Sequence, residues 1–148
     1  MSWLERATLV QALRAVVIYL WFLARQRDLM ASGALAGPDG LTLLGWEMLL
    51  LIIATVVVGI VIQIIATVFA TVVEGESVAA IEDERDRLIE ARATVKGFGV
   101  VGLGFLAAVL ALWQGWGAVW AFNLLLAGMV ASDILVNLLK FLRYARGG

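Results

Sequence analysis

The feature that most constrains this chain is an apolar stretch, residues 48–73, that contains no charged side chain. A hydrocarbon core of roughly 30 Å is crossed by about 20 helical residues, so this stretch is long enough to span a bilayer. Further apolar segments accompany it, and we expect membrane spans at about residues 7–24, 41–73, 97–113 and 117–139. The expected fold is an all-α integral membrane four-helix bundle that forms a single domain over residues 1–148.

The composition excludes several classes of function. Hydrophobic residues make up 63% of the chain and charged residues 16%, whereas a soluble domain has about a quarter of its residues charged. The net charge of −1 argues against nucleic acid as a partner, because a phosphate-binding surface needs a basic excess. The chain has no cysteine and no histidine, which removes thiol nucleophiles, iron–sulfur clusters and imidazole ligands for haem or zinc. No arrangement typical of a catalytic site remains, so we expect no enzyme activity, no cofactor and no metal site.

The distribution of lysine and arginine predicts the orientation of the spans. Four crossings place both termini and residues 74–96 on one side of the membrane, and the opposite side carries only Arg25 and Arg27. Apart from Arg14 inside the first span, the remaining basic residues lie on the side of the termini (Arg6, Arg85, Arg87, Arg92, Lys96, Lys140, Arg143 and Arg146). The positive-inside rule therefore predicts that both termini face the cytoplasm. Tryptophans gather at the outer interface, as in an aromatic belt (Trp21, Trp46, Trp113, Trp116 and Trp120).

Residues 7–24 are predicted to be a retained membrane helix, although they are short and contain Gln11 and Arg14. A secretory signal is the alternative, since residues 34–36 mimic a cleavage site. Residues 25–28 are charged or polar where a signal has small neutral residues, so the membrane helix is favoured. An arginine among residues 25–28 is expected to lie within reach of Glu47 at the outer interface.

A few polar residues lie inside the predicted spans at similar depth. Arg14 and Asp133 lie roughly 12 Å and 10 Å from the basic residues that end their spans, at a rise of 1.5 Å per residue. An ionised group in hydrocarbon costs about 2.5–3.5 kcal/mol, so we predict an Arg14–Asp133 ion pair in the bundle interior. Gln63, Gln11 and Asn137 are expected to complete its hydrogen bonds. Such a pair either holds the helices together or belongs to a proton or ion pathway, and the first is favoured because paired charges transfer protons poorly.

Residues 77–96 are predicted to form a charged amphipathic helix on the cytoplasmic side, before the third span. Ser77 is the expected N-cap, and the helix is expected to lie against the membrane face or the bundle. Its charged side chains are candidates for contact with a partner protein or with lipid headgroups (Glu82, Asp83, Arg85, Asp86, Arg87, Glu90 and Arg92). A metal site on the acidic face is a weaker alternative, because one straight helix rarely wraps six oxygen ligands around an ion.

Small residues recur in the last two spans. Residues 97–102 match the G-x-G-x-x-G pattern of dinucleotide-binding loops, but no strand precedes them, so that interpretation is rejected. Within a membrane, small residues at four-residue spacing allow helices to approach closely, as at Gly104/Ala108 and Gly128/Ser132. We expect these faces to pack helices together, either inside the chain or between copies.

The run from Glu82 to Glu90, Glu-Asp-Glu-Arg-Asp-Arg-Leu-Ile-Glu, precedes a glycine-containing membrane helix. With the basic, aromatic end at residues 141–148, it resembles a group of small bacterial four-helix inner-membrane proteins of unknown function. They carry an Asp-Glu-Arg-Asp-type motif before the third span. The resemblance covers about residues 49–148, and it implies this architecture and a bacterial inner membrane but no activity. Arg14 has no established counterpart in the group.

Two classes of function remain open. The first is a non-catalytic inner-membrane subunit or regulator that self-associates, or docks a protein partner through its cytoplasmic helix and small-residue faces. It would act in the lipid bilayer as a homo-oligomer or as part of a larger membrane complex. The alternative is a small oligomeric ion or proton channel or transporter with Asp133 in the pathway. The first is favoured because the turn at residues 114–117 is too short to act as a gate and most intramembrane polar residues lie in one half of the membrane.

Overall fold

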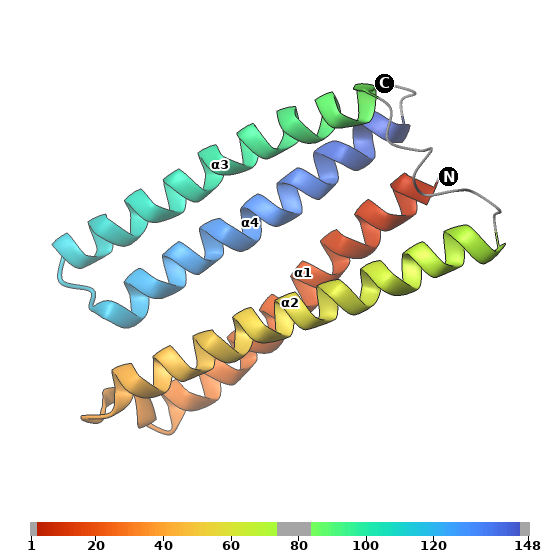
Figure 1. Ribbon diagram of the computed structural model, residues 1–148. Helices are drawn as coiled ribbons and strands as arrows, with labels where there is room; N and C mark the ends of the chain where they lie inside the picture. The colour runs from red at the N-terminus through yellow and green to blue at the C-terminus, as the bar shows by residue number, and fades with distance from the viewer. Residues whose placement is uncertain (1–2, 74–83, 146–148) are drawn as a thin grey trace.

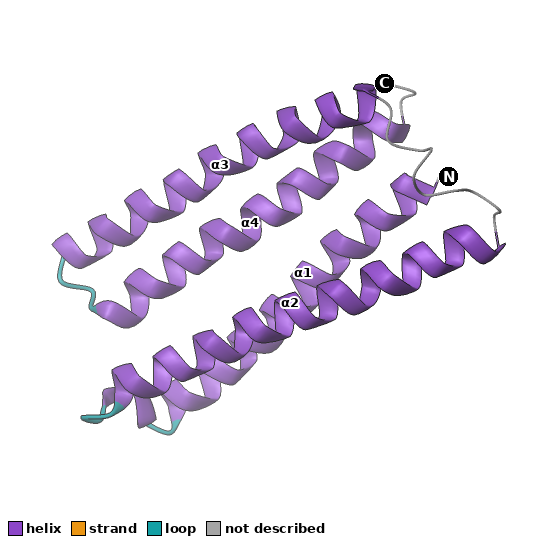
Figure 2. Ribbon diagram, in the orientation of Figure 1, coloured by secondary structure: helices purple, strands orange, loops and turns teal. Residues whose placement is uncertain are grey.

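The computed structural model describes the backbone of residues 3–73 and 84–145, and the side chains within them except at residues 3–5, 70, 73, 84–86 and 145. Four long helices make up the fold: α1 (Trp3–Ala31), α2 (Gly40–Val73), α3 (Glu84–Trp113) and α4 (Ala118–Ala145). A short 3-10 helix, η1 (Ala34–Ala36), lies between α1 and α2, and the described residues contain no strand (Figure 2). Each of the four long helices is long and apolar enough to cross a membrane. The predicted all-α membrane bundle is therefore confirmed.

The helices are arranged as an open layer rather than a closed bundle. Helix α3 packs along α4, α4 packs against α1, and α1 packs against α2. Helix α2 touches α4 only slightly, and within residues 3–73 and 84–145 it does not touch α3. The two termini lie at the same end of the molecule, as four crossings require (Figure 1). The spatial order is therefore α2, α1, α4, α3, with α2 and α3 at the edges.

The third helix is longer than the predicted span. Residues 84–96, the described part of the cytoplasmic helix predicted at residues 77–96, continue without a break into residues 97–113. Ile89 and Ala93 are buried, and α4 is the described helix that α3 contacts, so this part lies along the bundle and not flat on the membrane face. A continuous helix keeps every backbone hydrogen bond satisfied as the chain enters the apolar region. The predicted N-cap and the first acids of this helix lie outside the described residues (Ser77, Glu82 and Asp83).

The first and fourth helices also exceed their predicted bounds. Helix α1 continues to Ala31, past the predicted end at residue 24, and α4 continues to Ala145, past residue 139. The polar residues in these extensions do not interrupt helical hydrogen bonding. The positions of the charged residues therefore predicted where the apolar part of each segment ends. They did not predict where the helix itself ends.

Small residues determine how closely α3 and α4 pack. A Cβ atom built on Gly104 would lie 2.6 Å from the Cα atom of Gly128, and the reverse holds for Gly128. Nearer the termini on the same two helices, Gly97 of α3 packs against Ser132 and Val136 of α4. The predicted small-residue faces therefore pack on one another inside the chain, where they allow close backbone approach.

Five of the six tryptophans lie toward the end of the bundle opposite the termini, whereas Trp3 begins α1 at the other end. Gly115 and Gly117 have positive φ values of 77° and 87°, which glycine adopts without steric cost and which let the chain reverse direction between α3 and α4. Trp116 and Trp120 contact edge to face, with ring centroids 6.4 Å apart. The five tryptophans predicted for the aromatic belt are all exposed on the bundle surface (Trp21, Trp46, Trp113, Trp116 and Trp120).

Candidate functional site: an intramembrane polar cluster

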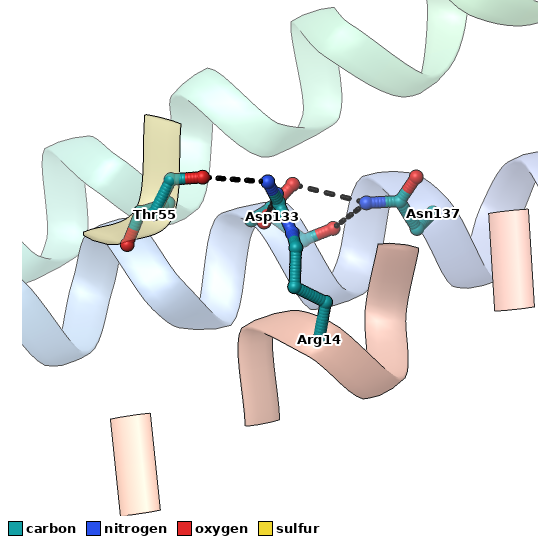
Figure 3. Close-up of polar contacts among 4 residues, drawn as sticks. All are labelled: Arg14, Thr55, Asp133 and Asn137. Atoms are coloured by element: carbon teal, nitrogen blue, oxygen red, sulfur yellow. Dashed lines mark hydrogen bonds and ion pairs between the residues drawn. The ribbon is translucent and has the colours of Figure 1, made fainter. Parts of the chain in front are cut away.

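Arg14 joins three of the four helices through its guanidinium group (Figure 3). Its Nη2 atom lies 3.4 Å from Oδ2 of Asp133 on α4. Its Nη1 atom donates a hydrogen bond of 2.9 Å to the backbone carbonyl of Thr55 on α2. The predicted ion pair between Arg14 and Asp133 is therefore present, and it is extended by a backbone acceptor on a third helix.

Gly59 makes the contact with α2 sterically feasible. In an α-helix a side chain leans back over the turn that precedes it, so the side chain at residue 59 would cover the carbonyl of Thr55. A Cβ atom at Gly59 would overlap Nη1 of Arg14. The glycine therefore opens α2 at the point where the guanidinium approaches its backbone.

Asn137 hydrogen-bonds the carboxylate oxygen of Asp133 that does not face Arg14. Its Nδ2 atom donates to Oδ1 of Asp133 at 3.0 Å and to the backbone carbonyl of Asp133 at 2.9 Å (Figure 3). Each carboxylate oxygen thus has one partner, since Oδ2 faces Arg14. Asn137 is buried, whereas the side chain of Asp133 is 39% exposed and that of Arg14 is 12% exposed. The acid is therefore the uncovered member of the cluster.

Gln63 does not belong to this cluster, so that part of the prediction is wrong. Gln63 and Gln11 instead line a groove of about 280 Å³ between α1 and α2, together with Arg6 and Phe69. The error comes from measuring depth from helix ends. Gly59, at the level of Arg14, lies about 21 Å from the end of α2 at Val73, so α2 reaches further toward the termini than α1 does.

A second cleft opens beside Asp133, between α2 and α4, with α1 as its floor. Its volume is about 280 Å³, and apart from Tyr19, Thr55 and Asp133 its walls are aliphatic or thioether side chains. The residues that line it come from all three helices (Ala15, Ile18, Tyr19, Leu51, Ile52, Thr55, Val56, Leu126, Met129, Val130 and Asp133). Because α2 and α4 barely touch, this cleft opens at the surface of the molecule and leaves Asp133 partly uncovered.

The charged residues at the end near the termini differ in their ion pairing and exposure. Glu90, predicted as a partner contact, forms an ion pair with Lys140 and so links α3 to α4 inside the chain. Arg92 and Arg87 are exposed on α3. The side chains of Arg85 and Asp86 lie outside the described part of the molecule, as do Glu82 and Asp83 altogether. Among the described residues, no three acidic side chains come together as a metal site.

A second ion pair lies at the opposite end of the bundle. Arg25 on α1 donates from Nε and Nη2 to the carboxylate of Glu47 on α2, at distances of 3.1–3.3 Å. The side chain of Glu47 is only 2% exposed, whereas that of Arg25 is 52% exposed. The expectation that Glu47 lies within reach of an arginine of residues 25–28 is therefore confirmed.

The sequence interpretation missed Thr55 and Gly59. A sequence does not indicate which backbone carbonyl will accept a hydrogen bond from a side chain. A lone glycine inside a run of valine and isoleucine, however, can be recognised. Such a glycine weakens a helix, so its presence indicates that another group approaches the backbone there. That signal at Gly59 could have identified the crossing point of Arg14.

Comparisons of this chain with protein-family models, with curated proteins and with solved structures find no match. The resemblance to small bacterial inner-membrane proteins therefore stays a prediction, and the interpretation of the cluster rests on its geometry.

Proposed function

We propose that this protein is a non-catalytic membrane subunit on which a further transmembrane helix packs over the cleft between α2 and α4, with its side chains entering the cleft. The helix would come from a second copy of the chain or from a larger membrane complex. The observation that carries the proposal is the partial exposure of Asp133, whose side chain remains 39% exposed on a cleft that opens at the surface of the molecule.

The energetic argument concerns the environment of a charge. An ionised carboxylate in hydrocarbon costs about 2.5–3.5 kcal/mol on insertion scales, and such groups normally face a protein interior or water. Arg14 and Asn137 neutralise and orient Asp133 but cover only part of it. A helix packed over the cleft, with its side chains filling it, would remove the rest of the carboxylate from lipid and could add a hydrogen bond to it.

The arrangement of the helices supports the same proposal. The small-residue faces of α3 and α4 are covered by one another, so they are not free for a partner. Helix α2 packs mainly against α1 and η1, which leaves its cleft-facing side accessible. Exposed apolar residues alone do not require a partner in a membrane, because lipid tails are equally apolar. The polar group in the cleft makes this face different from the others.

The channel hypothesis has less support. Beyond Asp133, toward the end with the tryptophans, Tyr19 is the polar residue in the wall of the cleft, and Leu51, Ile52 and Leu126 offer no polar groups to an ion. Asn123, also on α4, donates to the carbonyl of Val119 in its own helix. Ion flux from purified protein in liposomes, abolished by Asp133→Ala, would reverse this preference.

Two neighbouring valines on α2 provide a matched test. Val56 lines the cleft and is 53% exposed, whereas Val57 points about 100° away around α2, does not line the cleft and is 52% exposed. A tryptophan at residue 56 would fill the cleft, so Val56→Trp should reduce the assembly to monomers. Val57→Trp should leave the assembly intact, because it changes only a lipid-facing position.

The measurement is the protein mass in a mild detergent and in lipid nanodiscs, by size exclusion with light scattering. The proposal predicts a mass above that of one chain for the wild type and for Val57→Trp. A wild-type protein that is monomeric in both environments, and also uncrosslinked in native membranes, would contradict it. Equal assembly of the two tryptophan variants would exclude the cleft as the contact.

A further inference from the structure

Three basic side chains surround a shallow pocket at the end of the bundle that carries the termini. The pocket has a volume of about 350 Å³, and Ala91, Arg92, Val95 and Lys96 of α3 line it together with Arg143 of α4. Arg92 and Lys96 are four residues apart and so lie on one face of α3. We refer to these five residues as the basic pocket.

The charges of the basic pocket are not neutralised within the described part of the chain. No described carboxylate forms an ion pair or hydrogen bond with Arg92, Lys96 or Arg143. Glu90 is the described acid on the same stretch of α3, and it pairs with Lys140. The pocket therefore presents three positive charges without a described counter-charge.

The position of the pocket relative to the membrane follows from the length of the third span. Residues 97–113 lie between Lys96 and Trp113, and their helical length is about 25 Å, close to the thickness of a hydrocarbon core. Trp113 belongs to the tryptophan-rich end, which marks one headgroup region. Lys96 therefore lies near the opposite headgroup region, on the side of both termini.

The chemistry of the pocket fits a phosphate group. Arginine guanidinium groups present paired N–H donors that match phosphate oxygens, and lysine adds a compact charge. Val95 is strongly exposed beside the cations, so an acyl chain could pack against it while the headgroup meets the charges. A soluble anion would use the cations but not this apolar side.

We propose that the basic pocket binds the phosphate group of an anionic phospholipid in the leaflet on the side of the termini. Basic pockets between transmembrane helices on the cytoplasmic side are suited to such headgroups. This inference is independent of the proposed helix partner, because the pocket lies between α3 and α4 and not beside α2.

The test measures lipid binding to the purified full-length chain in a neutral detergent. Phosphatidylglycerol and phosphatidylcholine are titrated in turn, and bound lipid is counted by native mass spectrometry. The wild type should retain phosphatidylglycerol in preference to phosphatidylcholine. Arg92→Gln, Lys96→Gln and Arg143→Gln should each weaken phosphatidylglycerol binding by about fivefold, the contribution expected of one basic residue near a membrane surface.

Arg27→Gln is the matched control, because Arg27 is also exposed and lies at the opposite end of the bundle. Circular dichroism checks that all variants keep their helices, as expected for exposed positions. Retention unchanged in the three pocket variants, or lost equally in Arg27→Gln, would refute the proposal. Inorganic phosphate forms a separate arm: if it displaces bound phosphatidylglycerol at equal concentration, the ligand is a free phosphate and the lipid assignment is wrong.

Discussion

Nη1 of Arg14 occupies the space in which a Cβ atom of residue 59 would lie, so the arginine and Gly59 fit together as one steric unit. This fit brings the guanidinium to the carbonyl of Thr55 while the other side of the group faces Asp133. Three helices are thereby joined at one side chain. In an open layer with few contacts between α2 and α4, this connection fixes their relative position.

Gly59→Ala should destabilise the protein, whereas the same change at Gly45 should not. The new methyl group would displace Arg14 from Thr55 and leave a charged donor without its acceptor, at a cost of about 1–3 kcal/mol. Gly45 is also in α2, but nothing lies within 4 Å of a Cβ built there, so Gly45→Ala should be neutral or gain up to about 1 kcal/mol of helix propensity. Thermal unfolding in detergent measures both changes, and equal effects at the two glycines would contradict the steric role of Gly59.

Arg14 and Asp133 should show a strong coupling in a double-mutant cycle. Arg14→Gln or Asp133→Asn alone leaves one unpaired charge, and breaking a buried pair costs about 3–5 kcal/mol, less here because Asp133 is partly exposed. The double variant carries no charge at this site and should recover most of the lost stability. Additive losses in unfolding experiments would mean that the two residues act separately.

Gly104→Ala should loosen the contact between α3 and α4. The added Cβ atom would lie 2.6 Å from the backbone of Gly128, so the helices must move apart, and such overpacking costs about 1–3 kcal/mol. Gly102→Ala is the control, because Gly102 lies in the same helix with open space around it. Chemical unfolding of both variants checks the prediction, which fails if Gly102→Ala is as destabilising as Gly104→Ala.

The ion pair between Arg25 and Glu47 should respond unequally to the loss of each partner. Arg25→Gln leaves the buried carboxylate of Glu47 without its cation, whereas Glu47→Gln leaves an arginine that is 52% exposed and can turn to water. Arg25→Gln should therefore be the more destabilising change, by about 1–2 kcal/mol on the scale of hydrogen bonds to charged groups. Arg27→Gln serves as the control, and a larger effect from Glu47→Gln would contradict the burial argument.

Particular residues mark the limit of prediction from the sequence. Arg14 and Asp133 could be paired in advance because two opposite charges at one depth in hydrocarbon have few other partners. Gln63 was misplaced because its depth was counted from the end of α2, and helices that leave the membrane do not end at a common level. The sequence predicted that a charged helix extends the third span, but it left open whether that helix lies on the membrane face or on the bundle, and the structure shows it packed along α4.

The amino acids alone predict four helices able to cross a membrane, because the bilayer imposes a fixed length and apolarity on any helix that spans it. They also determine which polar residues would be costly to leave unpaired. Only the tertiary structure decided the order α2, α1, α4, α3 and the cleft that leaves Asp133 uncovered. The physical reason is that lipid solvates every apolar helix face about equally well, so hydropathy does not distinguish neighbours. Which helices become neighbours depends on where a glycine lets another backbone or a guanidinium group approach. This depends on matching positions on two helices.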